Sequence, residues 1–155
     1  MELARNLKVD SVSRLRPSPA LRLGPEDTVE QAVLLMKQYR VGCVLICRGD
    51  ELVGIFTERD LMRRVLAAGL PLSTALDDCM TIAPVVVRPK DSVAAAVRRM
   101  EEGGYRHLPI VDEAGRPLGM LSVKRIVHYL AEHFPATIYN LPPDPNIFPL
   151  RAEGA

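Results

Sequence analysis

The sequence predicts an α/β protein built from two β-α-β-β-α repeats, with small mixed sheets, packed in a pseudo-twofold arrangement. The first observation is a repeated pattern, because four residues return after a constant shift of 64 positions (89 − 25). These pairs are Pro25 and Pro89, Thr28 and Ser92, Ala32 and Ala96, and Met36 and Met100. The second is that each copy has only about 60 residues, a length that is marginally stable alone. The copies should therefore pack on each other and leave a cleft between them.

The first helix of each copy is predicted by apolar residues at helical spacing. Asp27 is expected to open the helix of the first copy, with Glu30 three residues later as its capping-box partner. Its apolar stripe is Val29, Ala32, Val33 and Met36, and the stripe of the second copy is Val93, Ala96, Val97 and Met100.

A β-hairpin and a second helix follow in each copy. Residues 43–47 and 108–111 are short apolar runs, each followed by a polar turn and by a second run that ends at Phe56 or Leu121. Gly54 and Thr57 match Gly119 and Ser122 at a shift of 65 (119 − 54), so the second hairpin carries one inserted residue. The second helices are expected over residues 58–68 and 123–133.

The pattern divides the chain into four parts. Residues 1–15 are a lead segment, residues 16–72 the first repeat, and residues 73–133 the second repeat. Residues 134–155 form a proline-rich tail, in which proline opposes a regular helix or central strand. The tail either lies along an apolar surface, of its own or of a partner subunit, or is disordered.

Composition points to a soluble, cytoplasmic protein. The formal net charge is +1, so no basic excess favours nucleic acid or an anionic membrane. The N-terminus is too polar for a secretory signal, and no apolar run is long enough to span a membrane. The three cysteines are an odd number in apolar surroundings, which favours reduced, buried thiols.

The sequence predicts neither a catalytic centre nor a metal site. Cys43 and Cys47 have no second Cys or His pair nearby, so core packing explains them better than zinc. His128 and His133 are five residues apart and do not share a helix face. No G-x-S-x-G nucleophile motif and no G-x-x-x-x-G-K phosphate loop is present.

Two stretches of the chain resemble the tandem cystathionine-β-synthase (CBS) domain pair, or Bateman module. They are LVGIFTERDL, which contains the Gly54, Thr57 and Asp60 signature, and GYRHLPIVDEAGRPLGMLS, which contains an Arg-His-Leu-Pro run from Arg106. With the repeats, the resemblance covers roughly residues 16–133. It implies an adenosine-ligand sensor rather than an enzyme.

The resemblance also implies roles for residues in a cleft between the repeats. Asp60 would hold the ribose hydroxyls and Thr57 the ribose or phosphate, because a helix start accepts phosphate readily. Thr57 and Asp60 also have the spacing of a capping box, which is the structural alternative. The remaining ligand-binding residues are expected to be Thr81, Ile82 and Ala83 against the adenine, Arg106 or His107 on phosphate, and Ser122.

The second copy departs from this pattern, since Arg125 stands where the first copy has Asp60. The second site therefore lacks the ribose-binding carboxylate. Arg106 could instead be a solvated side chain, and His107 a half-buried, hydrogen-bonded ring.

The expected function is that of a stand-alone regulatory module. It would bind an adenine nucleotide (AMP, ADP or ATP) as a regulatory ligand, require no cofactor, form a homodimer and signal to a regulated protein. Two alternatives remain open: a ligand-free structural or scaffolding dimer, and a binder of S-adenosylmethionine or nucleic acid.

Overall fold

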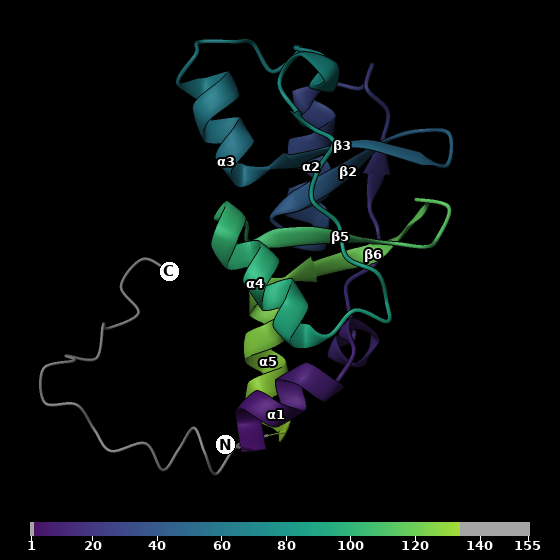
Figure 1. Ribbon diagram of the computed structural model, residues 1–155. Helices are drawn as coiled ribbons and strands as arrows, with labels where there is room; N and C mark the ends of the chain where they lie inside the picture. Colours follow the sequence, from purple (N-terminus) through teal and green to yellow (C-terminus); the bar gives the residue numbers. More distant parts are fainter. Residues whose placement is uncertain (1, 134–155) are drawn as a thin grey trace, which may run out of the picture.

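The computed structural model describes residues 2–133, which form two halves that each contain a small sheet and helices (Figure 1). The helices and strands follow one another along the chain, with short helical turns between some of them. The main helices are α1 (Glu2–Val9), α2 (Val29–Tyr39), α3 (Glu58–Asp60), α4 (Val93–Gly103) and α5 (Val123–His133). The strands are β1 (Arg22–Leu23), β2 (Cys43–Arg48), β3 (Glu51–Thr57), β4 (Thr81–Ile82), β5 (His107–Val111) and β6 (Pro117–Ser122). The α/β class, both hairpins and α5 are as the sequence predicts.

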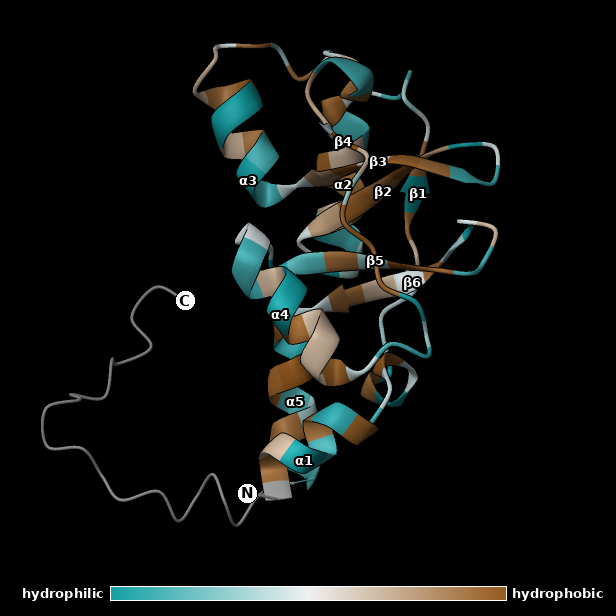
Figure 2. Ribbon diagram, in the orientation of Figure 1, coloured by the Kyte–Doolittle hydropathy of each residue, from teal (hydrophilic) through white to brown (hydrophobic). Residues whose placement is uncertain are grey.

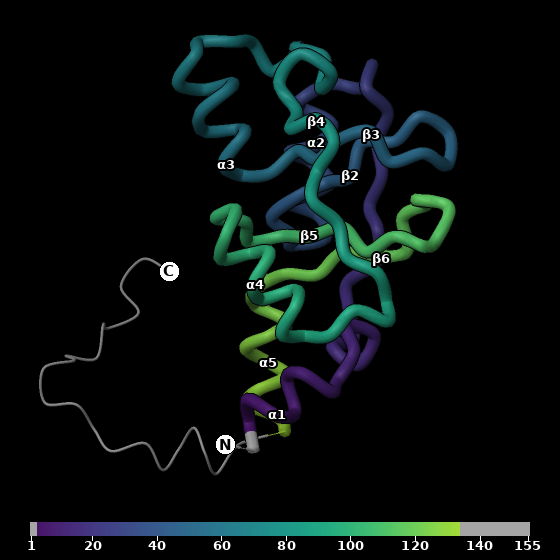
Figure 3. The backbone as a smooth tube through the Cα atoms, in the orientation of Figure 1, coloured from purple at the N-terminus to yellow at the C-terminus, as the bar shows by residue number. Residues whose placement is uncertain are grey.

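Each sheet is completed by a segment that leads into the other repeat. The first sheet has the order β1-β2-β3-β4, with β1 parallel to β2 and the other neighbours antiparallel. Around β5 and β6, Val87 forms a parallel bridge with Ile110, and Ser18 an antiparallel bridge with Met120. Figure 3 shows both lead-in segments passing between the halves. This exchange produces the pseudo-twofold arrangement.

The exchanged segments explain why both copies have a glycine in the second strand of the hairpin. A Cβ atom on Gly54 would lie 3.0 Å from the carbonyl oxygen of Thr81, and one on Gly119 would lie 3.0 Å from that of Ser18. Backbone oxygens cannot move away as flexible side chains can. The repeated glycine is therefore required by the close approach of the lead-in segment.

The N-cap of α2 differs from the expected one. Thr28, not Asp27, caps the helix, and Gln31 rather than Glu30 completes the capping box. Asp27 instead accepts a hydrogen bond from the backbone N–H of Gly24 at 2.7 Å, which closes the preceding turn. The expectation was wrong by one residue because aspartate favours turns as well as caps.

The helix after β3 is not a regular α-helix over residues 58–68. Thr57 caps α3, which is a single turn, and residues Leu61–Leu66 continue it as a π-helix. In this wider coil the backbone N–H of Ala67 reaches the carbonyl of Met62, five residues back. Val65 is fully buried in the wider turn.

The residues of the lead segment are part of the second core. Val12 and Leu15 are buried beside Val87 and Val93, and α1 packs against α4. The sequence indicated no helix here, because eight residues give too short a pattern to recognise. Figure 2 shows the apolar strands at the centre of each half.

Two further cores complete the packing. One lies inside the first repeat, and Leu76 of the connection between repeats is fully buried in it. The other joins the sheets, where Met120 packs with Cys43, Leu45 and Ile55. All three cysteines are buried and free, as predicted.

No helix within residues 2–133 is long and apolar enough to cross a membrane. The proline-rich tail of residues 134–155 lies outside the described residues.

Candidate functional site

The first pocket lies between the repeats and has a volume of about 490 Å³. This falls within the range of about 300–1,000 Å³ that is usual for small-molecule sites. Its wall comes from the junction of β3 and α3, from β4 and the residues after it, and from the turn before β5. The lining residues are Ile55, Thr57, Glu58, Arg59, Met62, Thr81, Ile82, Ala83, Pro84, Val85, Gly104, Tyr105, Arg106 and His107.

Most of the predicted site residues meet in this pocket, although they come from segments far apart in the sequence. Those that line it are Thr57, Thr81, Ile82, Ala83, Arg106 and His107. Asp60 is not among the lining residues, and Ser122 lines a different pocket.

Asp60 is 5% exposed and is held behind the pocket by its own hydrogen bonds. Its Oδ2 accepts from the backbone N–H of Thr57 at 3.0 Å and from the Thr57 hydroxyl at 3.2 Å. Its Oδ1 accepts from the Thr81 hydroxyl at 3.0 Å and lies 3.4 Å from Nε of Arg64. The capping-box alternative is therefore realised, and the carboxylate also ties α3 to β4.

Ala83 bends the pocket wall directly after β4. Its φ of 48° lies in the left-handed region, which costs a residue with a Cβ roughly 1–2 kcal/mol. The matching residue of the first copy is Pro19, whose ring holds φ near −65°. The two lead-in segments therefore cannot follow the same path, and the two pockets differ.

The polar end of the first pocket contains Arg59, Arg106, His107 and Glu58. Arg59 donates to the carbonyl of Gly104 at 3.2 Å, which joins the repeats at this end. Burial lowers the pKa of His107, the Glu58 carboxylate opposes this shift, and Arg106 adds to it. His107 is therefore predominantly neutral at pH 7 and able to gain a proton when an anion approaches.

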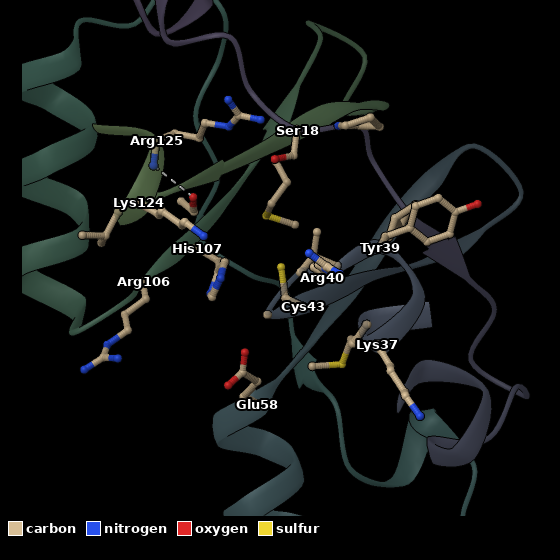
Figure 4. A pocket seen from close by; sticks show the side chains of 18 of the residues that line it. Ser18, Lys37, Tyr39, Arg40, Cys43, Glu58, Arg106, His107, Lys124 and Arg125 are labelled. Carbon is tan, nitrogen blue, oxygen red and sulfur yellow. Dashed lines mark hydrogen bonds between the residues drawn. The ribbon is translucent and has the colours of Figure 1, made fainter. Parts of the chain in front are cut away.

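The second pocket is related to the first by the repeat and has a volume of about 1180 Å³. Ser122 and Arg125 occupy the positions of Thr57 and Asp60, and Ser18 and Pro19 come from the other lead-in segment. Figure 4 shows Arg40 and His107 near its centre, with the Glu58 carboxylate directed toward His107. Apart from the Cys43 thiol and the Tyr39 phenol, its charged and titratable side chains are Lys37, Arg40, Glu58, Arg106, His107, Lys124, Arg125 and His128.

Sequence reasoning missed the contribution of α2 to this pocket. Arg40 precedes the β2 strand just as Gly104 precedes β5, so applying the 64-residue shift to the first pocket would have indicated it. Glu58, Arg106 and His107 line both pockets, which also emerges only from the tertiary structure.

The described residues provide no metal site and no activated thiol. No group of three or more His, Cys, Asp or Glu side chains within residues 2–133 is placed to hold a metal ion. Burial, with a smaller effect from Glu58, raises the pKa of Cys43 to about 12. This thiol is protonated at neutral pH and is a poor nucleophile.

Comparison with known proteins agrees with this architecture. The CBS domain family matches twice, over residues 12–67 and 76–132. A CBS domain-containing protein of Arabidopsis thaliana is 31% identical over 121 residues, which are 76% of this chain. This chain spans only 22% of the length of that relative.

Two solved structures show the same fold. A CBS-domain protein from Agrobacterium tumefaciens has a TM-score of 0.71 and 26% identity, and the match covers 77% of this chain and 98% of that one. A CBS domain protein from Pyrobaculum aerophilum, complexed with AMP, has a TM-score of 0.71 and 24% identity, over 79% of this chain and 99% of that one. The repeats, their exchanged strands and these matches lead to one conclusion: the chain belongs to the CBS-domain family.

Proposed function

We propose that this chain is a regulatory CBS pair that binds an adenine nucleotide in the first pocket and catalyses no reaction. The observation that carries the proposal is the meeting of Thr57, Thr81, Ile82, Arg106 and His107 around one cavity of about 490 Å³. A chain of this family with a similar fold has been solved with AMP bound. The fold similarity supports an adenosine ligand, and the lining of the pocket supports its placement.

The base would occupy the apolar part of the pocket. Ile82 of β4 and Met62 of the helix after β3 both line this pocket, and they are 70% and 60% exposed, which is unusual for large apolar side chains. Covering such surfaces is favourable by about 25 cal/mol per Å² of buried apolar area. An adenine ring against these side chains would gain this free energy, and the backbone of residues 81–83 would bind its edge.

The phosphate would occupy the basic end. Arg106 and Arg59 carry permanent charge, and His107 would gain a proton beside a phosphate, since a nearby anion stabilises imidazolium. AMP, ADP and ATP differ in how many of these groups they would engage.

The ribose would bind near Thr57, with Asp60 behind it. A carboxylate has about four acceptor positions, and Asp60 already accepts three hydrogen bonds. Nε of Arg64 lies 3.4 Å from Oδ1 as a fourth partner, so a ribose hydroxyl would have to replace the Thr81 hydroxyl. Ribose binding would then release β4 from α3, which offers a mechanism for reporting the ligand to a partner.

We further propose that the protein works as a cytoplasmic homodimer that signals to a regulated protein. Several large apolar side chains on the helices are exposed and line neither pocket, namely Leu34, Leu66, Val97 and Val127. A second copy would cover such faces by isologous contacts. Sedimentation equilibrium tests the dimer directly, since a monomeric mass at all concentrations would contradict it.

The nucleotide site is tested by calorimetric titration of AMP, ADP, ATP and S-adenosylmethionine into the wild type and into Ile82→Asp. A carboxylate in the wall should weaken the preferred nucleotide at least tenfold, because it desolvates on binding and repels phosphate. Leu118→Asp is the matched control, since Leu118 is a 54% exposed strand residue that lines neither pocket.

Equal affinity in Ile82→Asp and the wild type would place the nucleotide elsewhere. If only S-adenosylmethionine binds, the proposed location of the site stands but the ligand is not a nucleotide. If no adenosine compound binds at millimolar concentration, the chain is a ligand-free scaffold and the proposal is wrong.

A further inference from the structure

The second pocket gathers several positive charges and only one negative charge. Its wall holds five arginine and lysine side chains and two histidines, but a single carboxylate, that of Glu58. The arginine and lysine residues are Lys37, Arg40, Arg106, Lys124 and Arg125.

None of these five cations forms an ion pair with another described residue. Within residues 3–133, the ion-paired arginines are instead those outside this pocket. They are Arg14 with Asp10, Arg22 with Asp50, Arg48 with Glu26, Arg64 with Asp60, Arg99 with Asp91 and Arg116 with Asp112. Cations brought together without partners repel one another, and an anion in the pocket would relieve that repulsion.

The arrangement of the cations suits an extended anion. In Figure 4, Arg40 and His107 lie near the centre, Arg125 extends toward Ser18, and Lys37 and Arg106 extend to opposite sides. Lys37 and Arg106 point away from the centre, so the charges are spread out rather than converging on one point. A guanidinium group donates two parallel hydrogen bonds to the oxygens of one phosphate. Several guanidinium groups can therefore bind the successive phosphates of one chain.

The pocket is not equipped for the ribose of a nucleotide in the way the first pocket is. Arg125 occupies the position of Asp60 and offers only donors, so it cannot accept hydrogen from ribose hydroxyls. Ser122 caps the start of α5 as Thr57 caps α3, since its hydroxyl accepts from the backbone N–H of Arg125 at 3.2 Å.

We propose that the second pocket, around Arg40, His107 and Arg125, binds a linear oligophosphate anion and does not require a nucleoside. The anion lies between α2 of the first repeat and the start of α5 of the second. It therefore bridges the repeats beside the first pocket, with which the second pocket shares Glu58, Arg106 and His107.

Calorimetric titration of inorganic triphosphate in magnesium-free buffer tests the proposal. One triphosphate should bind per chain, with an affinity that falls as salt is raised. Arg40→Gln and Arg125→Gln should each weaken binding about tenfold, because each removes a charge-assisted contact. Arg98→Gln is the matched control, since Arg98 is an exposed helical arginine outside both pockets.

Ile82→Asp separates this site from the nucleotide site, because it alters only the first pocket and should leave triphosphate affinity unchanged. Circular dichroism of each variant shows whether it is folded before its affinity is compared. An equal loss in Arg98→Gln, or no binding at millimolar triphosphate, would overturn the proposal. So would a loss in Ile82→Asp as large as that in Arg125→Gln.

Discussion

Replacing Asp60 by alanine should destabilise the protein even when no ligand is present. The carboxylate caps α3 through Thr57 and ties β4 to the helix through Thr81, so its removal leaves several polar groups without partners. Loss of the cap costs about 1 kcal/mol, and the Thr81 hydroxyl loses a bond worth about 1 kcal/mol. The Arg64 pair adds up to about 0.5 kcal/mol, because its guanidinium is 52% exposed.

The total of about 2–3 kcal/mol should lower the melting temperature by roughly 5–10 °C for a chain of this size. Differential scanning calorimetry measures the shift, and urea titration at constant m-value checks the free energy. Asp60→Asn keeps one carbonyl acceptor and should lose about half as much. Asp78→Ala removes an exposed carboxylate near the same connection and should change stability by less than about 0.5 kcal/mol.

Equal melting temperatures for Asp60→Ala and Asp78→Ala would refute the described network and leave Asp60 free for ligand. A loss of stability also means that a reduced thermal shift by nucleotide in Asp60→Ala does not by itself demonstrate lost binding. Affinity has to be measured directly on the folded variant.

Three further outcomes follow from the same contacts. Because burial lowers the pKa of His107, its NMR titration should have a midpoint below the ordinary value of about 6.5. As pH falls, the unfolded chain is protonated at His107 at a higher pH than the folded protein. The free energy of unfolding therefore falls as pH drops from 6.5 toward the native pKa, and His107→Gln should flatten that slope. Gly42→Ala would place a Cβ 2.8 Å from Oε1 of Glu58 and 2.9 Å from Nε2 of His107. Both side chains would have to move, which should weaken both nucleotide and triphosphate binding in calorimetric titration. Phe56→Ala empties a fully buried position in the first core and should cost about 3–5 kcal/mol by urea unfolding, whereas a loss below 1 kcal/mol would contradict its burial.

The local elements could largely be predicted from the sequence, because each depends on neighbours close in the chain. Apolar residues at helical spacing located α2 and α4, and pairs of short apolar runs separated by a polar turn located both hairpins. The exceptions are also local. Thr28 rather than Asp27 caps α2, and the helix after β3 becomes a π-helix at Leu61, a change of coil that composition does not signal.

The candidate site could be predicted only in part. The repeat and its motif indicated Thr57, Ile82 and Arg106, and all three line the first pocket. The motif did not show that Asp60 is already hydrogen-bonded behind that pocket, because its partner Thr81 is 21 residues away.

The sequence by itself therefore determined the duplication, the class of fold and the approximate positions of α2, α4 and α5. Tertiary structure alone decided that each repeat completes the other's sheet, that Val12 and Leu15 enter the second core, and that Arg40 and Arg125 share a pocket. The physical reason is distance along the chain. Capping and periodicity act within a few residues, whereas packing joins segments whose separation leaves no pattern in the sequence.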